Sequence, residues 1–141
     1  MFETILQAQE PNFLIGIALS VGAGLLIGIE RELRGKAAGI STYTMVIGGS
    51  MLFTFLSATT DPESRTRIAA QIVTGIGFLG AGLIIREGGD IKNLTTAASI
   101  WFAAAIGMAL GFGYYGVAVI STIISVIAPR IPKIRHREYT H

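Results

Sequence analysis

Glu30 and the arginines near it are the side chains in this sequence best placed to do chemistry. Glu30, Arg31 and Arg34 directly follow one uncharged segment, and Arg86 follows another. A carboxylate there would pair with the arginines, or would give an oxygen ligand to a hard cation such as Mg²⁺, which needs only one or two protein carboxylates. The neighbouring arginines weaken the metal interpretation because they repel a dication. Mg²⁺ at Glu30 is the only cofactor that the sequence suggests.

Hydroxyl and amide side chains lie at the same level, where two further segments begin. Asn93 or Thr95 is expected to cap the helix that follows them, because such side chains accept bonds from free amides at a helix start. The predicted inner polar cluster consists of Glu30, Arg31, Arg34, Thr42, Arg86, Asn93, Thr95 and Thr96. On the other side, Arg67 and Gln71 stand one helical turn apart. Gln71 would bond a neighbouring helix or line an ion path.

Five uncharged segments must position these side chains. All nine acidic residues, all eleven basic residues and all four prolines fall outside them. An unpaired charge is costly in lipid, so this partition predicts an all-α, polytopic transmembrane bundle over residues 1–128. A basic tail, residues 129–141, follows. The predicted spans are about 13–29, 43–58, 68–85, 97–112 and 115–128, of which the last is the shortest.

The basic residues predict the orientation of the bundle. Nine Lys and Arg residues fall on the side of the inner polar cluster and two, Arg65 and Arg67, on the other. Basic loops stay in the cytoplasm, so the N-terminus is expected outside and the C-terminus inside.

Small residues predict close helix packing. Ala70, Thr74, Gly77 and Ala81 recur at helical spacing and form a stripe, which lets another backbone approach in lipid. We expect a homodimer for this reason. The glycines assigned to helix packing are Gly24, Gly28, Gly75, Gly77, Gly80, Gly82, Gly107 and Gly111.

Two stretches of the sequence echo one another. GAGLLI at 22–27 and GAGLII at 80–85 each precede a loop that contains an Arg–Glu pair. In both cases two adjacent hydroxyl residues follow at the end of the loop. The echo suggests two helical hairpins in a parallel repeat with one helix added. The alternative is that glycine-rich spans simply look alike.

Several functional classes lack support in the sequence. No acidic or basic side chain lies within a predicted span, there is no phosphate loop, and there is no cysteine. We therefore expect no enzyme activity and no nucleic-acid binding.

Three strings carry a resemblance to a known family: GIERELRGKAAGISTYTMV, RIAAQIVTGIGFLGAGLIIREGGDIKNLTTAASIW and AIGMALGFGYYGVA. Over roughly residues 15–125 the chain resembles the membrane domain of the MgtC/SapB family. The resemblance implies a prokaryotic cytoplasmic-membrane protein linked to low magnesium, and in some members to acid tolerance or intracellular survival. It also implies action on other membrane proteins, including the ATP synthase. The soluble C-terminal domain of longer relatives is not expected after the tail.

The family's motif positions overlap the polar cluster and the glycines. The sequence departs from the family's pattern at two places. Ser41 stands where the family often has Arg. Asp61 and Pro62 lie further from Arg67 along the chain than the family's Asp-Pro pair usually does. The matching positions are Gly28, Glu30, Arg31, Arg34, Gly39, Thr42, Arg67, Gln71, Gly75, Gly77, Gly80, Gly82, Leu94, Thr95, Thr96 and Trp101.

Three functional hypotheses follow. The first is a non-enzymatic membrane protein of magnesium homeostasis or stress adaptation that acts through lateral contact with partner membrane proteins. The alternative is a magnesium or proton transporter or channel with a path at an oligomer interface, lined by Gln71, Thr74 and Glu30. The third, a purely structural membrane protein, leaves the inner polar cluster without a role.

Overall fold

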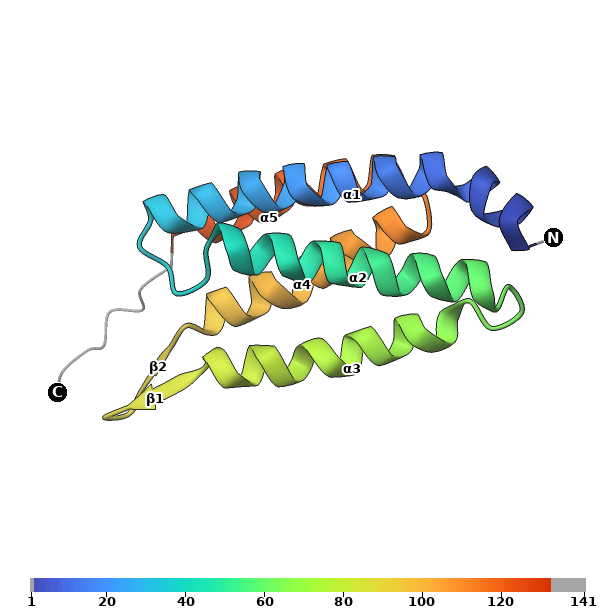
Figure 1. The fold of residues 1–141 in the computed structure, drawn as a ribbon. Helices are drawn as coiled ribbons and strands as arrows, with labels where there is room; N and C mark the ends of the chain where they lie inside the picture. The colour runs from blue at the N-terminus through green and yellow to red at the C-terminus, as the bar shows by residue number, and fades with distance from the viewer. Residues whose placement is uncertain (1, 133–141) are drawn as a thin grey trace, which may run out of the picture.

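The computed structural model describes the backbone of residues 2–132 and the side chains of residues 11–132. Within this range the chain forms five α-helices that run up and down beside one another, with one short β-hairpin (Figure 1). The predicted all-α bundle is confirmed. The elements are α1 (Phe2–Leu33), α2 (Ile40–Thr60), α3 (Thr66–Leu83), β1 (Ile85–Glu87), β2 (Asp90–Lys92), α4 (Leu94–Gly111), α5 (Tyr115–Ile127) and the 3₁₀ turn η1 (Ala128–Arg130).

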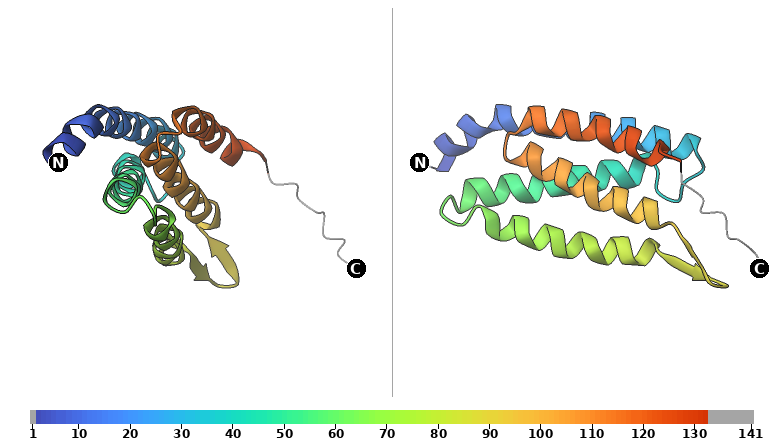
Figure 2. Two further views of the ribbon diagram at one scale, coloured as in Figure 1. Left: turned by 90° about the vertical axis from the view of Figure 1, so that its right-hand side faces the viewer. Right: turned by 180° about the vertical axis from the view of Figure 1, so that it is seen from behind.

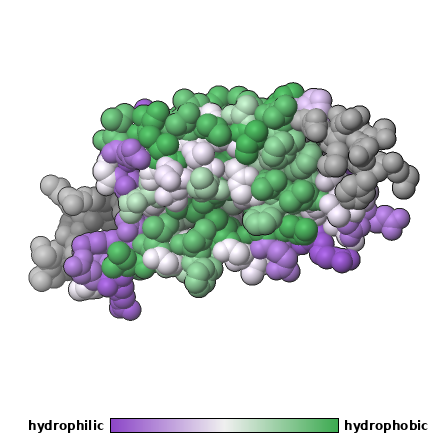
Figure 3. All heavy atoms as spheres, viewed as in Figure 1, coloured by the Kyte–Doolittle hydropathy of each residue, from purple (hydrophilic) through white to green (hydrophobic). Residues whose placement is uncertain are grey.

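Four of the described helices are long and apolar enough to cross a membrane: Pro11–Leu33 within α1, and all of α2, α3 and α4. Figure 3 shows a broad apolar belt with hydrophilic residues gathered toward the two ends. Helix α5 has 13 residues. At about 1.5 Å per residue it reaches roughly 20 Å, less than the roughly 30 Å apolar core of a bilayer. Spanning by the fifth helix therefore stays a prediction.

The helix ends differ from the predicted span ends by one to three residues in α2, α3 and α4, and two differences are larger. Helix α1 includes Pro11 and extends back to Phe2. Pro11 has no amide hydrogen and cannot donate the helical hydrogen bond to residue 7, yet the helix continues through it. The charged stretch after α3 is an antiparallel hairpin in which Arg86 pairs with Ile91. Gly88 and Gly89 turn it with φ values of 61° and 104°, a backbone region that glycine enters without strain.

Close backbone contacts hold α2 between α1 and α4. A Cβ atom added at Gly24 would lie 2.6 Å from Cα of Thr44, and one at Gly111 would lie 2.6 Å from the carbonyl oxygen of Met51. Gly28 and Gly107 meet α2 just as closely. The fully buried side chains of Ile27, Ile47 and Ile106 fill the space around these contacts.

Helix α3 packs much more loosely and lies at the edge of the bundle (Figure 2). Its buried residues are Ala69, Ile76 and Gly80. A Cβ added at Gly75, Gly77 or Gly82 would meet no atom within 4 Å. The predicted stripe of small residues is exposed along its whole length, at Ala70, Thr74, Gly77 and Ala81.

The glycine contacts also bear on the sequence echo. Helices α1 and α3 run the same way in the bundle (Figure 1). However, Gly24 packs against α2, whereas a Cβ atom added at its counterpart Gly82 would have no atom of the described chain within 4 Å. The parallel repeat stays a prediction, and the helix contacts within its two halves are not equivalent.

We predict that Gly24→Ala lowers the free energy of unfolding by about 1–3 kcal/mol, because the methyl group overlaps the α2 backbone. Gly22→Ala is the matched control, since a Cβ at Gly22 meets no atom within 4 Å. Thermal unfolding in detergent, followed by the fluorescence of Trp101, measures both. Equal melting temperatures for the two variants would contradict the packing described for α1 and α2.

Candidate functional site

Part of the inner polar cluster, Glu30, Arg31, Arg34 and Thr96, comes together where the last turns of α1 meet α2, α4 and η1. Ile27, Glu30 and Arg31 lie at i, i+3 and i+4, and therefore share one face of α1. That face points into the bundle: Ile27 is completely buried, Glu30 is 5% exposed and Arg31 is 1% exposed. The helical spacing that buries an isoleucine thus also buries an acid and a base one turn later.

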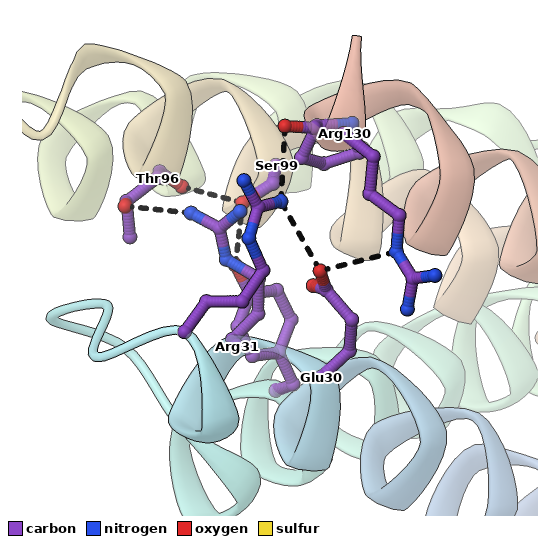
Figure 4. A network of polar contacts seen from close by, with 8 residues as sticks. Glu30, Arg31, Thr96, Ser99 and Arg130 are labelled. Carbon is purple, nitrogen blue, oxygen red and sulfur yellow. Dashed lines mark hydrogen bonds and ion pairs between the residues drawn. The ribbon is translucent and has the colours of Figure 1, made fainter. Parts of the chain in front are cut away.

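Glu30 joins the end of α1 to η1. Its Oε1 atom accepts a hydrogen bond from Nη1 of Arg34 at 3.2 Å and lies 3.5 Å from Nε of Arg130. Nη1 of Arg34 also donates to the carbonyl oxygen of Pro129 at 3.1 Å. Figure 4 shows the Glu30 carboxylate facing Arg130. The Oε2 atom is buried and has no hydrogen-bond partner among the described residues.

Arg31 joins α1 to α4. Its Nη2 atom donates to Oγ1 of Thr96 at 2.8 Å (Figure 4). Ser99 donates to the carbonyl oxygen of Thr96 at 2.9 Å and is also hydrogen-bonded to the hydroxyl of Tyr43 on α2. The Nε and Nη1 atoms of Arg31 are buried without a hydrogen-bond partner among the described residues.

The other predicted members of the cluster lie outside this network. Thr42 is exposed on the first turn of α2, and Arg86 is exposed on β1 because the hairpin carries it beyond the helices. Asn93 stands at the N-cap position of α4, but no side chain caps this helix. This corrects the expected capping by Asn93 or Thr95. Asn93 has a φ of 64°, whereas a capping residue typically has an extended backbone.

Three residues of this network, Tyr43, Ser99 and Arg130, are not among the site residues predicted from the sequence. Ser99 lies three residues after Thr96 and hence on the same face of α4, which is a signal that could have found it. Arg130 was counted only as part of the basic tail. Nothing in the sequence around Tyr43 indicates that its hydroxyl lies opposite α4.

The predicted outer residues do not meet the inner polar cluster. Arg67 donates to Oγ of Ser64 at 3.1 Å and is exposed. Gln71 is exposed and lines an apolar groove of about 410 Å³ between α2 and α3, beside Gly75 and Phe53.

A cavity of about 810 Å³, here called the basic cavity, opens beside the network. It lies between the end of α1, the following loop, β2, the first turn of α4, and the segment that contains η1. Its charged lining residues are Arg31, Arg34, Lys36, Lys92 and Arg130. Such a lining attracts anions and repels dications.

The geometry around Glu30 does not favour a metal ion. Two guanidinium groups already contact Oε1. Within residues 11–132 no group of three or more His, Cys, Asp or Glu side chains gathers that could hold a metal. The carboxylate thus serves as a counter-ion for arginines in this arrangement.

We predict that Thr96→Val lowers the free energy of unfolding by about 1–3 kcal/mol, because Nη2 of the buried Arg31 loses the hydrogen bond to Oγ1 of Thr96. Thr95→Val, next to it but exposed, should change stability by less than about 0.5 kcal/mol. Chemical unfolding in detergent micelles compares the two. A Thr96 variant as stable as the parent would show that the bond to Arg31 contributes nothing.

Residues 17–137 match the model of the MgtC family. The chain is 45% identical over 116 residues to Protein MgtC of Salmonella typhimurium (strain LT2), a match that covers 82% of this chain and 50% of that protein. It is 44% identical over 104 residues to Protein MgtC of Brucella abortus (strain 2308), covering 73% of this chain and 44% of that protein. The chain therefore spans about half the length of these curated relatives. No solved structure shows a significant match.

Proposed function

Because the chain belongs to the MgtC family, we propose that it is a non-enzymatic membrane protein of magnesium homeostasis, or of adaptation to low magnesium and acid. It acts by lateral contact with partner membrane proteins. The ATP synthase is one candidate partner, and a second copy of the chain is another.

The observation that carries this proposal is the exposed stripe on α3. Ala70, Thr74, Gly77 and Ala81 form a shallow strip that no other part of the described chain covers. In a bilayer, hydrophobicity does not drive helices together, and small residues favour association because they allow close backbone contact. Gly24 and Gly28 on α1 already have contacts of this kind within the chain. The stripe on α3 is therefore suited to a helix from another molecule, and a symmetric pair of such stripes would form a homodimer.

The orientation belongs to the proposal as well. The α1–α2 loop, the hairpin and η1 lie at one end of the bundle, and the α2–α3 loop with Arg65, followed by Arg67 on the first turn of α3, lies at the other (Figure 1). This separation supports a cytoplasmic location for the basic cavity in a prokaryotic cytoplasmic membrane.

We predict that a cysteine at Glu63 reacts with a membrane-impermeant maleimide in intact cells, whereas a cysteine at Asp90 reacts only after lysis. The native chain has no cysteine, so each variant carries a single thiol. Labelling in the opposite pattern would reverse the proposed orientation.

The proposal predicts that Gly77→Leu abolishes complementation of a deletion strain growing in low magnesium, because the larger side chain blocks close approach to α3. Gly22→Leu is the control, since Gly22 also has open space around it but lies on α1. Immunoblotting must show equal amounts of both variants in the membrane. Full growth with Gly77→Leu would contradict a role for this face.

Crosslinking measures the contact directly. A cysteine at Thr74 should crosslink to a second copy or to a partner protein in native membranes, whereas a cysteine at Ile123, exposed on α5, should not. Equal crosslinking at both positions would indicate random collision.

The transporter alternative has its own test. Magnesium or proton flux into liposomes that contain the parent chain, lost in the variant Glu30→Gln, would support that alternative.

A further inference from the structure

We propose that the basic cavity is a binding site for a phosphate-bearing anion. Neither the resemblance of the sequence nor the proposed contact through α3 assigns a ligand to this end of the bundle. The inference rests on the charge of the cavity, on the unsatisfied donors of Arg31, and on the uncapped start of α4.

The side chains that line the cavity give it a positive charge. Five cationic side chains line it, and no carboxylate among the described residues does. Two carboxylates contact these cations: Glu30 contacts Arg34 and Arg130, and Glu87 pairs with Lys92. Glu32 and Asp90 are adjacent in sequence to lining residues but line the cavity themselves no more than Glu30 does, and Glu32 accepts a hydrogen bond from the amide of Ile40. Arg31 and Lys36 have no ion pair in the described structure, and the set as a whole keeps an excess of positive charge. Such an excess attracts anions.

Arg31 provides the observation that points to a ligand. It is 1% exposed and lines the cavity, yet only Nη2 has a hydrogen-bond acceptor. Its Nε and Nη1 atoms are buried and unpartnered among residues 11–132. A buried guanidinium is stable only when its charge and its donors are satisfied. A phosphate in the cavity would place its negative charge beside this guanidinium, and guanidinium groups match phosphate geometry.

The first turn of α4 adds donors from a second direction. Asn93, Thr95 and Thr96 line the cavity, and no side chain caps this helix of 18 residues. The first amides of a helix lack intrahelical acceptors and carry partial positive charge, which stabilises anions. Ile91 and Ile131 contribute apolar surface at the rim. A phosphate group with an attached organic part fits this mixture of surfaces.

Two sources could supply this chemistry at the membrane surface: free phosphate compounds in the cytoplasm and the headgroups of anionic phospholipids. The volume of about 810 Å³ accommodates either. The test therefore needs one arm for each source.

The first arm measures the binding of inorganic phosphate by calorimetry, using the full chain in phosphatidylcholine nanodiscs at constant ionic strength with chloride as reference. The parent should bind saturably, and the double variant Lys36→Gln with Lys92→Gln should bind about tenfold more weakly. Both lysines are exposed, so the variant should fold. Arg67→Gln with Arg86→Gln removes two charges that do not line the cavity and should leave binding unchanged.

The second arm uses native mass spectrometry of the chain purified from membranes that contain phosphatidylglycerol and phosphatidylcholine. Retention of phosphatidylglycerol, lost in the lysine variant and kept in the arginine control, would identify a lipid headgroup as the ligand. Specific binding in either arm supports the proposal and names the source. The absence of specific binding in both arms, or equal weakening by the control variant, would overturn it.

Discussion

The close approach of α4 to α2 is the contact on which the rest of the structure depends. Gly107 and Gly111 lie against the backbone of α2 at Ile47 and Met51, where even a Cβ atom would overlap. This contact fixes the position of α4 along the bundle axis relative to its neighbours. Several turns away, that position allows Thr96 to hydrogen-bond to Arg31 and Ser99 to hydrogen-bond to Tyr43. In lipid, where small residues permit such an approach, glycine placement thereby determines which polar groups meet at the helix ends.

Helix α3 has the same kind of residues but a different environment. It has four glycines in 18 residues, twice as many as α4, yet only Gly80 approaches another helix among the described residues. The hairpin and the loop at its two ends connect it to the bundle while its outer face stays uncovered. Spacing alone does not distinguish these cases, because a stripe of small residues is equally suitable for a helix of the same chain and for one of another molecule.

The sequence predicted what depends on local patterns and missed what depends on relative helix positions. The partition of charges predicted the helices and the all-α class, and the motifs predicted the family to which the chain belongs. Glu30 was expected to pair with an arginine, and Arg34 is one of its two partners. Arg130 was missed because its contact joins residues 100 positions apart, which no periodicity encodes. The hairpin was missed because each strand has only three residues.

Two kinds of basic residue occupy the predicted cytoplasmic end, and burial separates them. A residue that only sets topology needs to lie near a span end and keeps its charge in water, as Arg86 does. Arg31 does not fit this description, because its charge is almost completely removed from solvent. Removing a guanidinium from water is unfavourable, so its position must be stabilised by what surrounds it. Thr96 supplies one acceptor, and the nearest carboxylate in sequence, Glu30, is engaged by Arg34 and Arg130 instead. The arrangement therefore leaves an incompletely satisfied cation between α1 and α4, and this is a property of a binding site more than of a topology signal.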